Sequence, residues 1–506
     1  MTNLELPTRF DLERLASSLG LELNKEEIDT YLEEIQGKYE QLEYLAGLKF
    51  TSSQASRATP TISYPSPNNN EHGAWRTQFS LSYDTRTNGP LQGKRIAIKD
   101  NVSIAGIPMS IGSSLLKNYV PQRDATLVTR ILEAGGTIVG TTTCEDLCSS
   151  GGSHTSYPSV VRNPRDHHRM AGGSSSGSAV VVATGEVDIA IGADQGGSIR
   201  IPSSWCGVFG LKPTWGLVPY TGVASVDPTL DHVGPIARTV EDLALALEAM
   251  AGRDDRDHRQ RMAQVPARLP EYLAESRIAP YNLRVAVLQE GFHWPDLSED
   301  VVDDACEDVV TTLVKHGVKV SRVSIPLHRR AVMTWGGIAA EGTWAVMYRD
   351  NTNGYGYKGF YDTDLAEIWG NTLRTVPNQL PVTVKFNLLY GAYLASIYHG
   401  NFYGAAQNFL PTLTAVYDQA LQEYDALLLP TTPQRAPLFP SPNSSIKVQL
   451  DAAYNMVCNV APFNATGHPA LNVPIQSYDG LPIGYMLVTK RFKDDTLLRL
   501  ARCFES

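Results

Sequence analysis

Apolar residues along this chain form short continuous runs and segments with three- and four-residue spacing. The continuous runs predict buried strands at 94–100, 137–140, 187–194, 283–291 and 425–433. Helices are predicted at 125–136, 176–185 and 298–316, the first with Asp124 as its N-cap and the Gly135–Gly136 pair at its end. Because strands and helices alternate, the sequence predicts an α/β domain.

The N-terminal segment has a different pattern. Residues 8 to about 48 are predicted to be helical, with Asn24 and Glu27 spaced as in a capping box. Apolar side chains recur there at helical spacing in one stripe: Ile28, Tyr31, Leu32, Ile35, Tyr39, Leu42 and Leu45. A helix with one apolar stripe must bury it, and we expect it to pack on the main body or on a second subunit.

Three further segments have compositions of their own. The arm 49–90 is rich in Ser, Pro, Asn and Thr, which predicts a surface connection, and the charge-rich stretch 252–282 predicts a surface excursion. Residues 330–420 hold many aromatic side chains, most of which we expect in the core or in interfaces. We therefore divide the chain into a helical segment (1–50), a connecting arm (51–90) and a main domain (91–506).

Composition and charge narrow the class of protein. Of the 506 residues, 42% are hydrophobic and 19% are charged, which permits a large core and argues against global disorder. The formal net charge of −10 disfavours binding to the negatively charged phosphates of DNA or RNA, so we expect no nucleic-acid partner. The first residues show no basic leader, and no run of about 18 uninterrupted apolar residues occurs. We therefore expect a cytoplasmic protein without a membrane partner.

The six cysteines are too few for a disulfide framework. Cys144 and Cys148 form a C-x3-C pair, for which a metal or redox site is one interpretation. No second Cys or His pair completes a ligand set, so we favour two small buried side chains and predict no metal site.

Two segments rich in serine and glycine carry the candidate chemistry. The first, MAGGSSSGSA (170–179), has the composition of a flexible linker, but it leads directly into an apolar helix. It also differs from a phosphate-binding loop, because no lysine follows its last glycine. Small residues between buried elements indicate instead that the backbone lies close to a ligand.

The second segment, GADQGGSIRIPSSWCG (192–207), starts at the end of a predicted strand, where sites gather in open α/β sheets. Gln195, Gly196, Gly197 and Ser198 offer consecutive N–H groups that can form an oxyanion hole. Ser198 then has the position of a nucleophile and needs a base to accept its proton. Cys206 has no nearby histidine and is expected in the core.

With these segments the chain resembles the amidase signature family. GGSSSGS, DQGGSIRIPSSWCGVFGLKPTWG and the strand RIAIKD occur in the family's order, and Ser174 and Ser198 have its spacing of 24 positions. DHVGPIART, DALLLPTTP, NATGHPALNVP and GLPIGYMLV also look like family segments. The N-terminal helices, LQEGFHWPDLSED and the DQGGS variant look most like the amidases associated with nitrile hydratases. The family fold implies an α/β, mixed open β-sheet covered by helices on both faces, with a small N-terminal helical segment.

The resemblance implies a Ser–Ser–Lys triad. Ser198 would attack the amide carbonyl, and Ser174, which follows a cis peptide bond in the family, would relay the proton to Lys99 as the neutral base. The strand before Lys99 is apolar, and burial disfavours a charged amine. The alternative, a surface lysine paired with Asp100, does not account for the two serine motifs.

Three neighbours are expected to support the triad. The resemblance implies that Ser175 hydrogen-bonds around the site, and Asp194 and Arg200 are expected to hold the nucleophile turn through charge-assisted hydrogen bonds. Because the triad itself supplies nucleophile, base and oxyanion donors, no metal or organic cofactor is implied.

The family implies hydrolysis of carboxylic amides to the acid and ammonia through a covalent acyl-enzyme. The aromatic-rich region suggests a small aliphatic or aromatic, apolar acyl group. Alternatives are a hydrolase of lactams, carbamates or acylated amines, and an amidotransferase subunit that releases ammonia from glutamine. An inactive binding protein is disfavoured because Lys99, Ser174 and Ser198 are all present. The apolar stripe and the relatives predict a homodimer formed through residues 8–48.

Overall fold

The computed structural model describes residues 4–48, 60–83, 89–352, 354–475 and 479–505. The chain divides into two compact units, residues 1–56 and 57–506.

The described residues of the smaller unit form the helices α1 (Arg9–Ser18), α2 (Lys25–Gln36) and α3 (Tyr39–Gly47), where the sequence predicted continuous helix. The predicted capping box is confirmed, because Asn24 Oδ1 accepts from the Glu27 N–H while Glu27 Oε2 accepts from the Asn24 N–H. Of the apolar stripe, Ile28 is buried, whereas four members remain exposed: Tyr31, Ile35, Leu42 and Leu45. The unit does not bury its own stripe.

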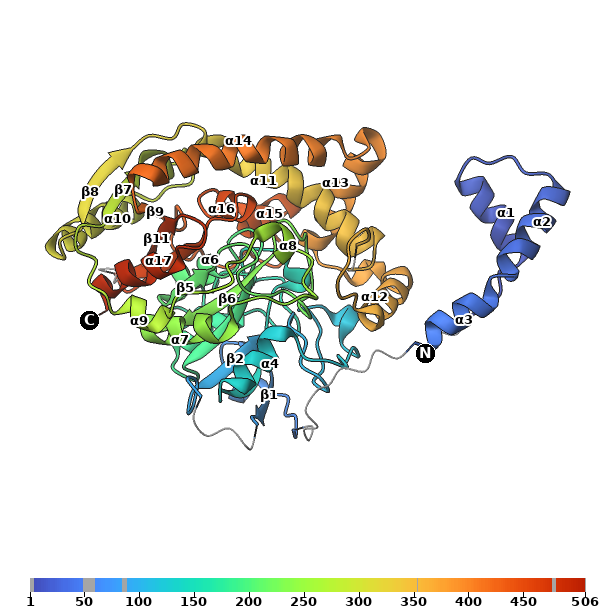
Figure 1. Ribbon diagram of the computed structural model, residues 1–506, viewed down its shortest axis with the longest axis horizontal. Helices are drawn as coiled ribbons and strands as arrows, with labels where there is room; N and C mark the ends of the chain where they lie inside the picture. The colour runs from blue at the N-terminus through green and yellow to red at the C-terminus, as the bar shows by residue number, and fades with distance from the viewer. Residues whose placement is uncertain (1–3, 49–59, 84–88, 353, 476–478, 506) are drawn as a thin grey trace. The chain divides into compact units, whose positions relative to one another are not determined.

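The larger unit is built on one mixed sheet, in which the described strands follow the order β1-β3-β2-β4-β6-β5-β10-β11-β9-β7-β8 (Figure 1). The strands are β1 (Trp75–Leu81), β2 (Arg95–Lys99), β3 (Thr137–Thr142), β4 (Ile189–Asp194), β5 (Phe209–Lys212), β6 (His232–Ala237), β7 (Arg284–Leu288), β8 (Lys319–Val323), β9 (Ala426–Pro430), β10 (Ala470–Ile475) and β11 (Ile483–Thr489). Strand β2 runs parallel to both β3 and β4. The mixed α/β sheet predicted from the family is confirmed.

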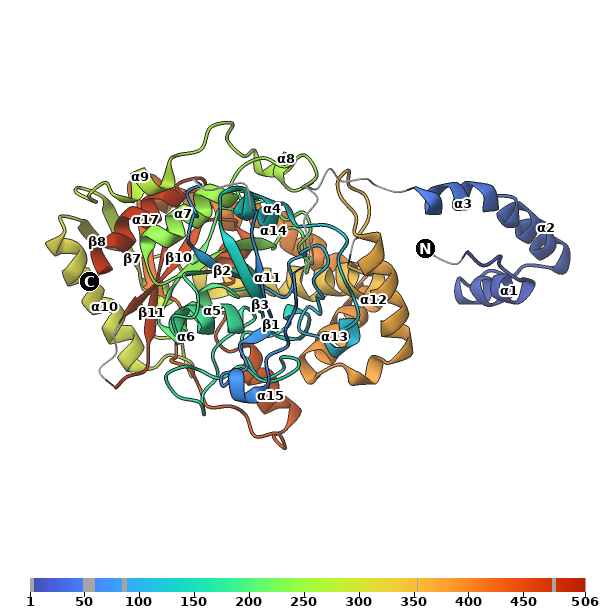
Figure 2. The same cartoon turned by 90° about the horizontal axis from the view of Figure 1, so that it is seen from below.

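Alternate residues of β2 explain why both faces of the sheet are covered. Ile96 and Ile98 join one hydrophobic cluster with α4 (Thr126–Glu133) and α7 (Val240–Met250). Ala97 points the other way, into a cluster with the valines of α5 (Ser176–Ala183). In Figure 2, α4 and α7 lie on one side of the strands, and α5 and α6 (Arg200–Cys206) lie on the other.

The remaining helices surround this core. They are α8 (Gln260–Ala263), α9 (Tyr272–Ser276), α10 (Asp300–Lys315), α11 (His328–Thr343), α12 (Thr363–Thr375), α13 (Val382–Tyr398), α14 (Asn401–Glu423), α15 (Ile446–Tyr454), α16 (Pro462–Ala465) and α17 (Asp494–Ala501). Among these helices, α11 packs against α13 and α14. Within the described residues, no helix combines the length and apolarity needed to cross a membrane.

Three predictions about the segments are wrong. The arm is not only a connection, because its residues 75–81 form β1 and bury Trp75 at the sheet edge. Asp124 does not cap α4: its Oδ1 accepts from the Ala105 N–H, and Ala125 holds the N-cap position. The stretch 252–282 is not a plain surface excursion, since Arg259 and Tyr272 are buried.

Candidate active site

The predicted site residues meet where β2 and β4 end. Lys99 is the last residue of β2 and Asp194 the last of β4, and the two strands are parallel neighbours, so their carboxyl ends share one edge. The two serine segments also touch, because the Ser175 N–H donates to the Ser198 carbonyl at 3.1 Å. The sheet therefore brings together residues that lie up to 99 positions apart, from Lys99 to Ser198.

Lys99 lies in the interior and contacts the first serine segment. Its side chain is fully buried, and Nζ donates to Ser174 Oγ at 2.8 Å and to the Ala193 carbonyl at 3.4 Å. The Gly173–Ser174 peptide bond is cis. The Ser174 carbonyl accepts from the Glu145 N–H. The backbone and the lysine thus hold Ser174 between β2 and the second serine segment.

Asp100 is not the partner of Lys99, so the alternative surface ion pair does not form. Asp100 is also buried, and both the N–H and the hydroxyl of Ser110 donate to its carboxylate, with Arg76 nearby. Burial raises the pKa of Asp100 to about 6, against the hydrogen bonds from Ser110 and the charge of Arg76, which lower it.

Asp194 and Arg200 hold the turn that carries Ser198. Arg200 Nε and Nη2 each donate to one Asp194 oxygen at 3.0 Å, and both side chains are fully buried. Burial would raise the pKa of Asp194, but the charge and hydrogen bonds of Arg200 outweigh it and keep that pKa below its usual range. Asn464 completes the pair by donating to Asp194 and accepting from Arg200. Sequence reasoning missed Asn464, because it lies 270 positions from Asp194.

One of the four predicted oxyanion donors is already engaged. The Gly197 N–H donates to Asp194 Oδ1 at 2.7 Å, so this group stabilises the turn itself. The prediction that it points at the substrate is wrong for this reason. Gln195, Gly196 and Ser198 remain the candidate donors. Ser175 links the two segments as expected, with Oγ donating to the Ala193 carbonyl at 3.0 Å.

A cavity of about 310 Å³ opens beside Ser198. Its walls come from residues 148–151, the second serine segment, α11, α13 and the loop 226–230, and the described residues that line it include no Asp, Glu, Lys or Arg. Four aromatic side chains take part: Trp335, Phe386, Tyr390 and Tyr454. The first three belong to the aromatic-rich region 330–420, whose other rings do not line the cavity. The cavity, named the acyl pocket here, suits an uncharged apolar group.

Two aromatic residues that sequence reasoning missed fix Gln195. Trp335 Nε1 donates to the Gln195 carbonyl at 2.7 Å, and Gln195 Nε2 donates to the Tyr220 hydroxyl at 2.7 Å. The Tyr220 hydroxyl in turn donates to the Ala224 carbonyl. These contacts join residues 140 and 25 positions apart, so local sequence carries no sign of them.

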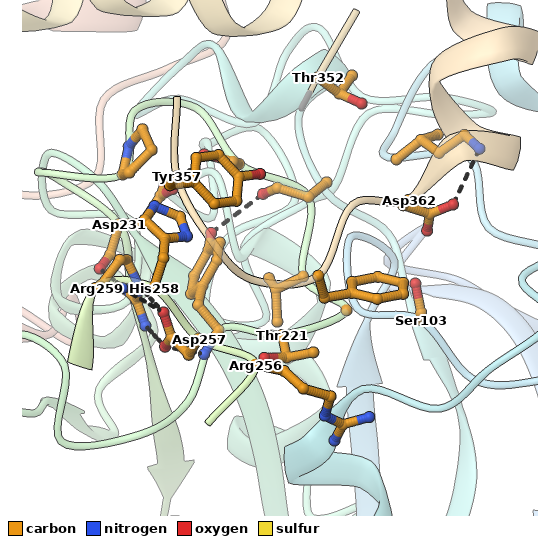
Figure 3. A pocket seen from close by; sticks show the side chains of 18 residues that line it. Ser103, Thr221, Asp231, Arg256, Asp257, His258, Arg259, Thr352, Tyr357 and Asp362 are labelled. Atoms are coloured by element: carbon orange, nitrogen blue, oxygen red, sulfur yellow. Dashed lines mark hydrogen bonds and ion pairs between the residues drawn. The ribbon is translucent and has the colours of Figure 1, made fainter. Parts of the chain in front are cut away.

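Tyr220 also borders a second, smaller cavity of about 70 Å³ (Figure 3). Figure 3 shows Asp257 paired with Arg259 on one side of it, where the carboxylate also accepts from the Tyr220 N–H. Asp231 lines the same cavity and is fully buried. Burial raises its pKa to about 7, against a hydrogen bond from Ser225 and the charge of Arg259.

The raised pKa of Asp231 predicts a pH effect on stability. Between the usual pKa of 3.8 and about 7, the folded protein keeps a proton on Asp231 that the unfolded chain releases. The free energy of unfolding therefore falls as the pH rises through that window. We expect Asp231→Asn to gain stability relative to the wild type between about pH 4 and about pH 8. Urea unfolding of both proteins at the two pH values checks this, and an unchanged difference would contradict it.

The C-x3-C pair does not have two buried thiols as predicted. Cys144 is buried, but Cys148 is partly exposed and lines the acyl pocket. Among the described residues, no group of three or more His, Cys, Asp or Glu side chains is arranged to hold a metal ion. Cys206 is buried, as expected.

Comparison with known proteins agrees with this architecture. A family model described as Amidase matches residues 52–498. The enantioselective amidase of Rhodococcus rhodochrous is 42% identical over 440 residues, covering 86% of this chain and 84% of the relative. Among solved structures, one chain of the glutamyl-tRNA(Gln) amidotransferase of Thermotoga maritima has a TM-score of 0.69 at 30% identity, covering 86% of this chain and 88% of that chain. Peptide amidase of Stenotrophomonas maltophilia has a TM-score of 0.68 at 27% identity, covering 83% and 84%.

The matched region contains both serine segments, Lys99 and all the described strands of the sheet. The share covered is high on both sides, so the match concerns most of the larger unit and not a single motif. The chain belongs to the amidase signature family and is an amidase, an enzyme that hydrolyses amide bonds.

Proposed function

We propose that this amidase cleaves small carboxylic amides with an apolar acyl group, using Ser198 as nucleophile, Ser174 as proton relay and Lys99 as base. Ser198 attacks the amide carbon, its proton passes through Ser174 to Lys99, and the proton returns to the leaving amine. Ammonia departs, and water hydrolyses the acyl-enzyme to the acid. The hydrogen bond from Lys99 to Ser174 inside the protein is the observation that supports this assignment.

The walls of the acyl pocket support the choice of substrate. Transfer of an apolar acyl group from water into a cavity lined by Trp335, Phe386 and Tyr390 lowers the free energy. Glutamine would bring an ammonium and a carboxylate into the same space, where the described lining offers no opposite charge. Burial without a partner is costly for a charged group. The pocket therefore favours simple amides over release of ammonia from glutamine.

Ammonia release tests the proposal. Wild-type protein is incubated with propionamide, benzamide and phenylacetamide, and a chiral 2-aryl amide is added as separate enantiomers because one relative is named enantioselective. We expect release with at least one of these amides and none with Ser198→Ala. Added hydroxylamine should divert the product to a hydroxamate, since it competes with water for the acyl-enzyme.

The other candidate substrates form the comparison panel. Glutamine, a lactam, a carbamate and an acylated amine are assayed in parallel. Activity confined to this panel would overturn the apolar-amide assignment, and release by Ser198→Ala equal to that of the wild type would overturn the nucleophile.

Tyr220→Phe tests whether the Tyr220 hydroxyl positions Gln195, one of the candidate oxyanion donors. The change removes only the hydroxyl that accepts from Gln195 Nε2, so the Gln195 side chain loses its anchor while the ring stays. We expect kcat to fall by about tenfold with little change in KM, because an oxyanion donor acts mainly in the transition state. Steady-state kinetics on the best amide measures this.

Tyr357→Phe is the matched control for Tyr220→Phe. Tyr357 lines the same small cavity, where its ring stacks on His258. Its hydroxyl loss should change kcat far less. Equal losses in both variants would assign the effect to the cavity and not to Gln195.

We also propose that the enzyme works as a cytoplasmic homodimer formed through residues 8–48 of the smaller unit. The exposed apolar residues of this unit, among them Phe10, Leu19 and Tyr44, support this proposal, because a surface of that kind favours burial in an interface. Light scattering of full-length protein and of a variant that lacks residues 1–56 tests it. A full-length monomer, or an unchanged dimer after deletion, would contradict the proposed interface.

A further inference from the structure

A buried carboxylate outside the proposed triad lies beside the first serine segment. Glu145 follows the end of β3 at Thr142, and β3 runs parallel to β2, so Glu145 lies at the same end of the sheet as Lys99. Its side chain is fully buried. A charged group in the interior is costly unless hydrogen bonds compensate it, so the partners of Glu145 show what it holds in place.

Three uncharged donor groups converge on this carboxylate. The Thr155 hydroxyl donates to Oε2 at 2.7 Å, the Thr155 N–H donates to Oε1 at 3.1 Å, and the Ser156 hydroxyl donates to Oε1 at 2.5 Å. An ionised carboxylate only accepts hydrogen bonds, so it can take all three. Thr155 and Ser156 are themselves partly exposed. Glu145 therefore anchors the loop 149–156 from the interior.

The anchored loop holds the first serine segment at two points. The Gly173 N–H donates to the Gly151 carbonyl at 2.8 Å, and the Ala171 N–H donates to the Ser153 hydroxyl at 2.9 Å. Gly173 is also closely packed, because a β-carbon added to it would lie 2.9 Å from Glu145 Cγ. The loop and the Glu145 side chain thus fix the backbone directly before the proposed relay serine.

Ser174 contacts both Glu145 and Lys99. The Glu145 N–H donates to the Ser174 carbonyl at 3.2 Å, and Lys99 Nζ donates to the Ser174 hydroxyl at 2.8 Å. The place of this hydroxyl depends on the backbone that carries it. A displacement of about 1 Å in a catalytic group can cost on the order of 10^2-fold in rate, so the anchor of this backbone matters for the reaction.

We propose that Glu145 is a positioning residue, whose carboxylate sets the place of Ser174 through the loop 149–156 so that the proton reaches the leaving amine. The inference rests on the proposed function, in which Ser174 relays that proton. Glu145 itself transfers no proton in this role. It acts through the backbone that carries Ser174.

A misplaced relay harms amides more than activated esters. The nitrogen of an amide must gain a proton as the C–N bond breaks, because an amine anion is a poor leaving group. A 4-nitrophenolate leaves without a proton. The loop residues Ser149, Ser150 and Gly151 line the acyl pocket, but an amide and the 4-nitrophenyl ester of the same acid share the acyl group. Changes in the pocket therefore cancel when kcat/KM for the amide is divided by kcat/KM for the ester.

This amide-to-ester ratio, measured with the best amide and full-length enzyme, tests the proposal. We expect Ser174→Ala to lower the ratio on the order of 10^2-fold and Glu145→Leu to lower it about tenfold. Glu145→Gln should keep the ratio within about twofold of the wild type, because its oxygen still accepts from Thr155 and the Ser156 hydroxyl can turn to accept from its NH2 group. Thr155→Val removes one donor and should lower the ratio about threefold.

Thr214→Val is the matched control for Thr155→Val. The Thr214 N–H and hydroxyl donate to the buried carboxylate of Asp494 at 2.8 Å and 2.7 Å, and neither residue belongs to a serine segment or to the loop 149–156. Loss of this hydroxyl should lower the free energy of unfolding and leave the amide-to-ester ratio unchanged. Urea unfolding measures the stability of every variant.

An unchanged ratio in folded Glu145→Leu would overturn the proposal, and so would equal falls in Thr155→Val and Thr214→Val. If Glu145→Leu does not fold, Thr155→Val decides: a lower ratio supports the role of Glu145, and an unchanged ratio contradicts it. An unchanged ratio in Ser174→Ala would instead remove Ser174 as the relay. A failure of the proposed function is thus distinguished from a failure of the role given to Glu145.

Discussion

Lys99→Met is expected to lower kcat for amide hydrolysis on the order of 10^6-fold, the scale seen when a catalytic triad loses its nucleophile or base. Methionine keeps an unbranched apolar stem but has no amine to accept a proton, and Ser174 loses its hydrogen bond from Nζ. Because the triad acts as one unit, the double variant with Ser198→Ala should be no slower than the slower single variant. Ammonia release under single-turnover conditions measures the loss.

Lys212→Met is the matched control for Lys99→Met. Lys212 is equally buried, but its Nζ donates to the His468 and Pro213 carbonyls, which belong to neither serine segment. Its replacement should reduce kcat far less. An enzyme that keeps most of its activity without the Lys99 amine would remove this lysine from the mechanism.

Arg200→Met is expected to destabilise the fold by about 3–5 kcal/mol, the usual cost of breaking a buried ion pair from one side. Asp194 would stay buried and keep the hydrogen bonds from the Gly197 and Ile199 N–H groups, but its charge would lose the guanidinium. Arg200 also donates to the Val460 carbonyl and to Asn464, so the contact with α16 would be lost too. The midpoint of urea unfolding measures the effect.

Arg322→Met shows what a partly exposed pair contributes. Arg322 forms two hydrogen bonds with Glu307, but its side chain is 55% exposed, so the expected loss is only about 0–1 kcal/mol. Equal shifts of the two unfolding midpoints would contradict the structural importance given to the Asp194–Arg200 pair.

Local patterns predicted the elements that build the site. Strand 94–100 ends at Lys99, and the apolar helix after the first serine segment is α5, because continuous apolar runs and glycine-rich breaks act over a few residues. The helix 298–316 is α10 in the structure. The order and spacing of the motifs also indicated the family. What these signals share is that each is complete within one short stretch of chain.

The errors have a common physical origin. Strand β1 lies in a polar segment and forms because β3 offers it an antiparallel edge, which no local pattern encodes. Asp124 has the right position for a cap, but the Ala105 N–H competes for its carboxylate. Tyr220 and Trp335 reach Gln195 only after the sheet has assembled. Strand pairings and hydrogen bonds between residues far apart in the sequence therefore could not be predicted from local patterns.

The origin of the pocket walls has a consequence for evolution of the enzyme. Lys99, Ser174 and Ser198 lie at the ends of sheet strands or beside them, whereas Trp335, Ala339, Phe386 and Tyr390 come from α11 and α13. Substitutions at Ala339, Phe386 and Tyr390 can reshape the cavity without altering the residues that carry the protons, whereas Trp335 also holds the Gln195 carbonyl. Mutations of the pocket wall can thus change which acyl groups bind while the hydrolytic residues stay the same. Substrate specificity can therefore evolve faster than the type of reaction within this fold.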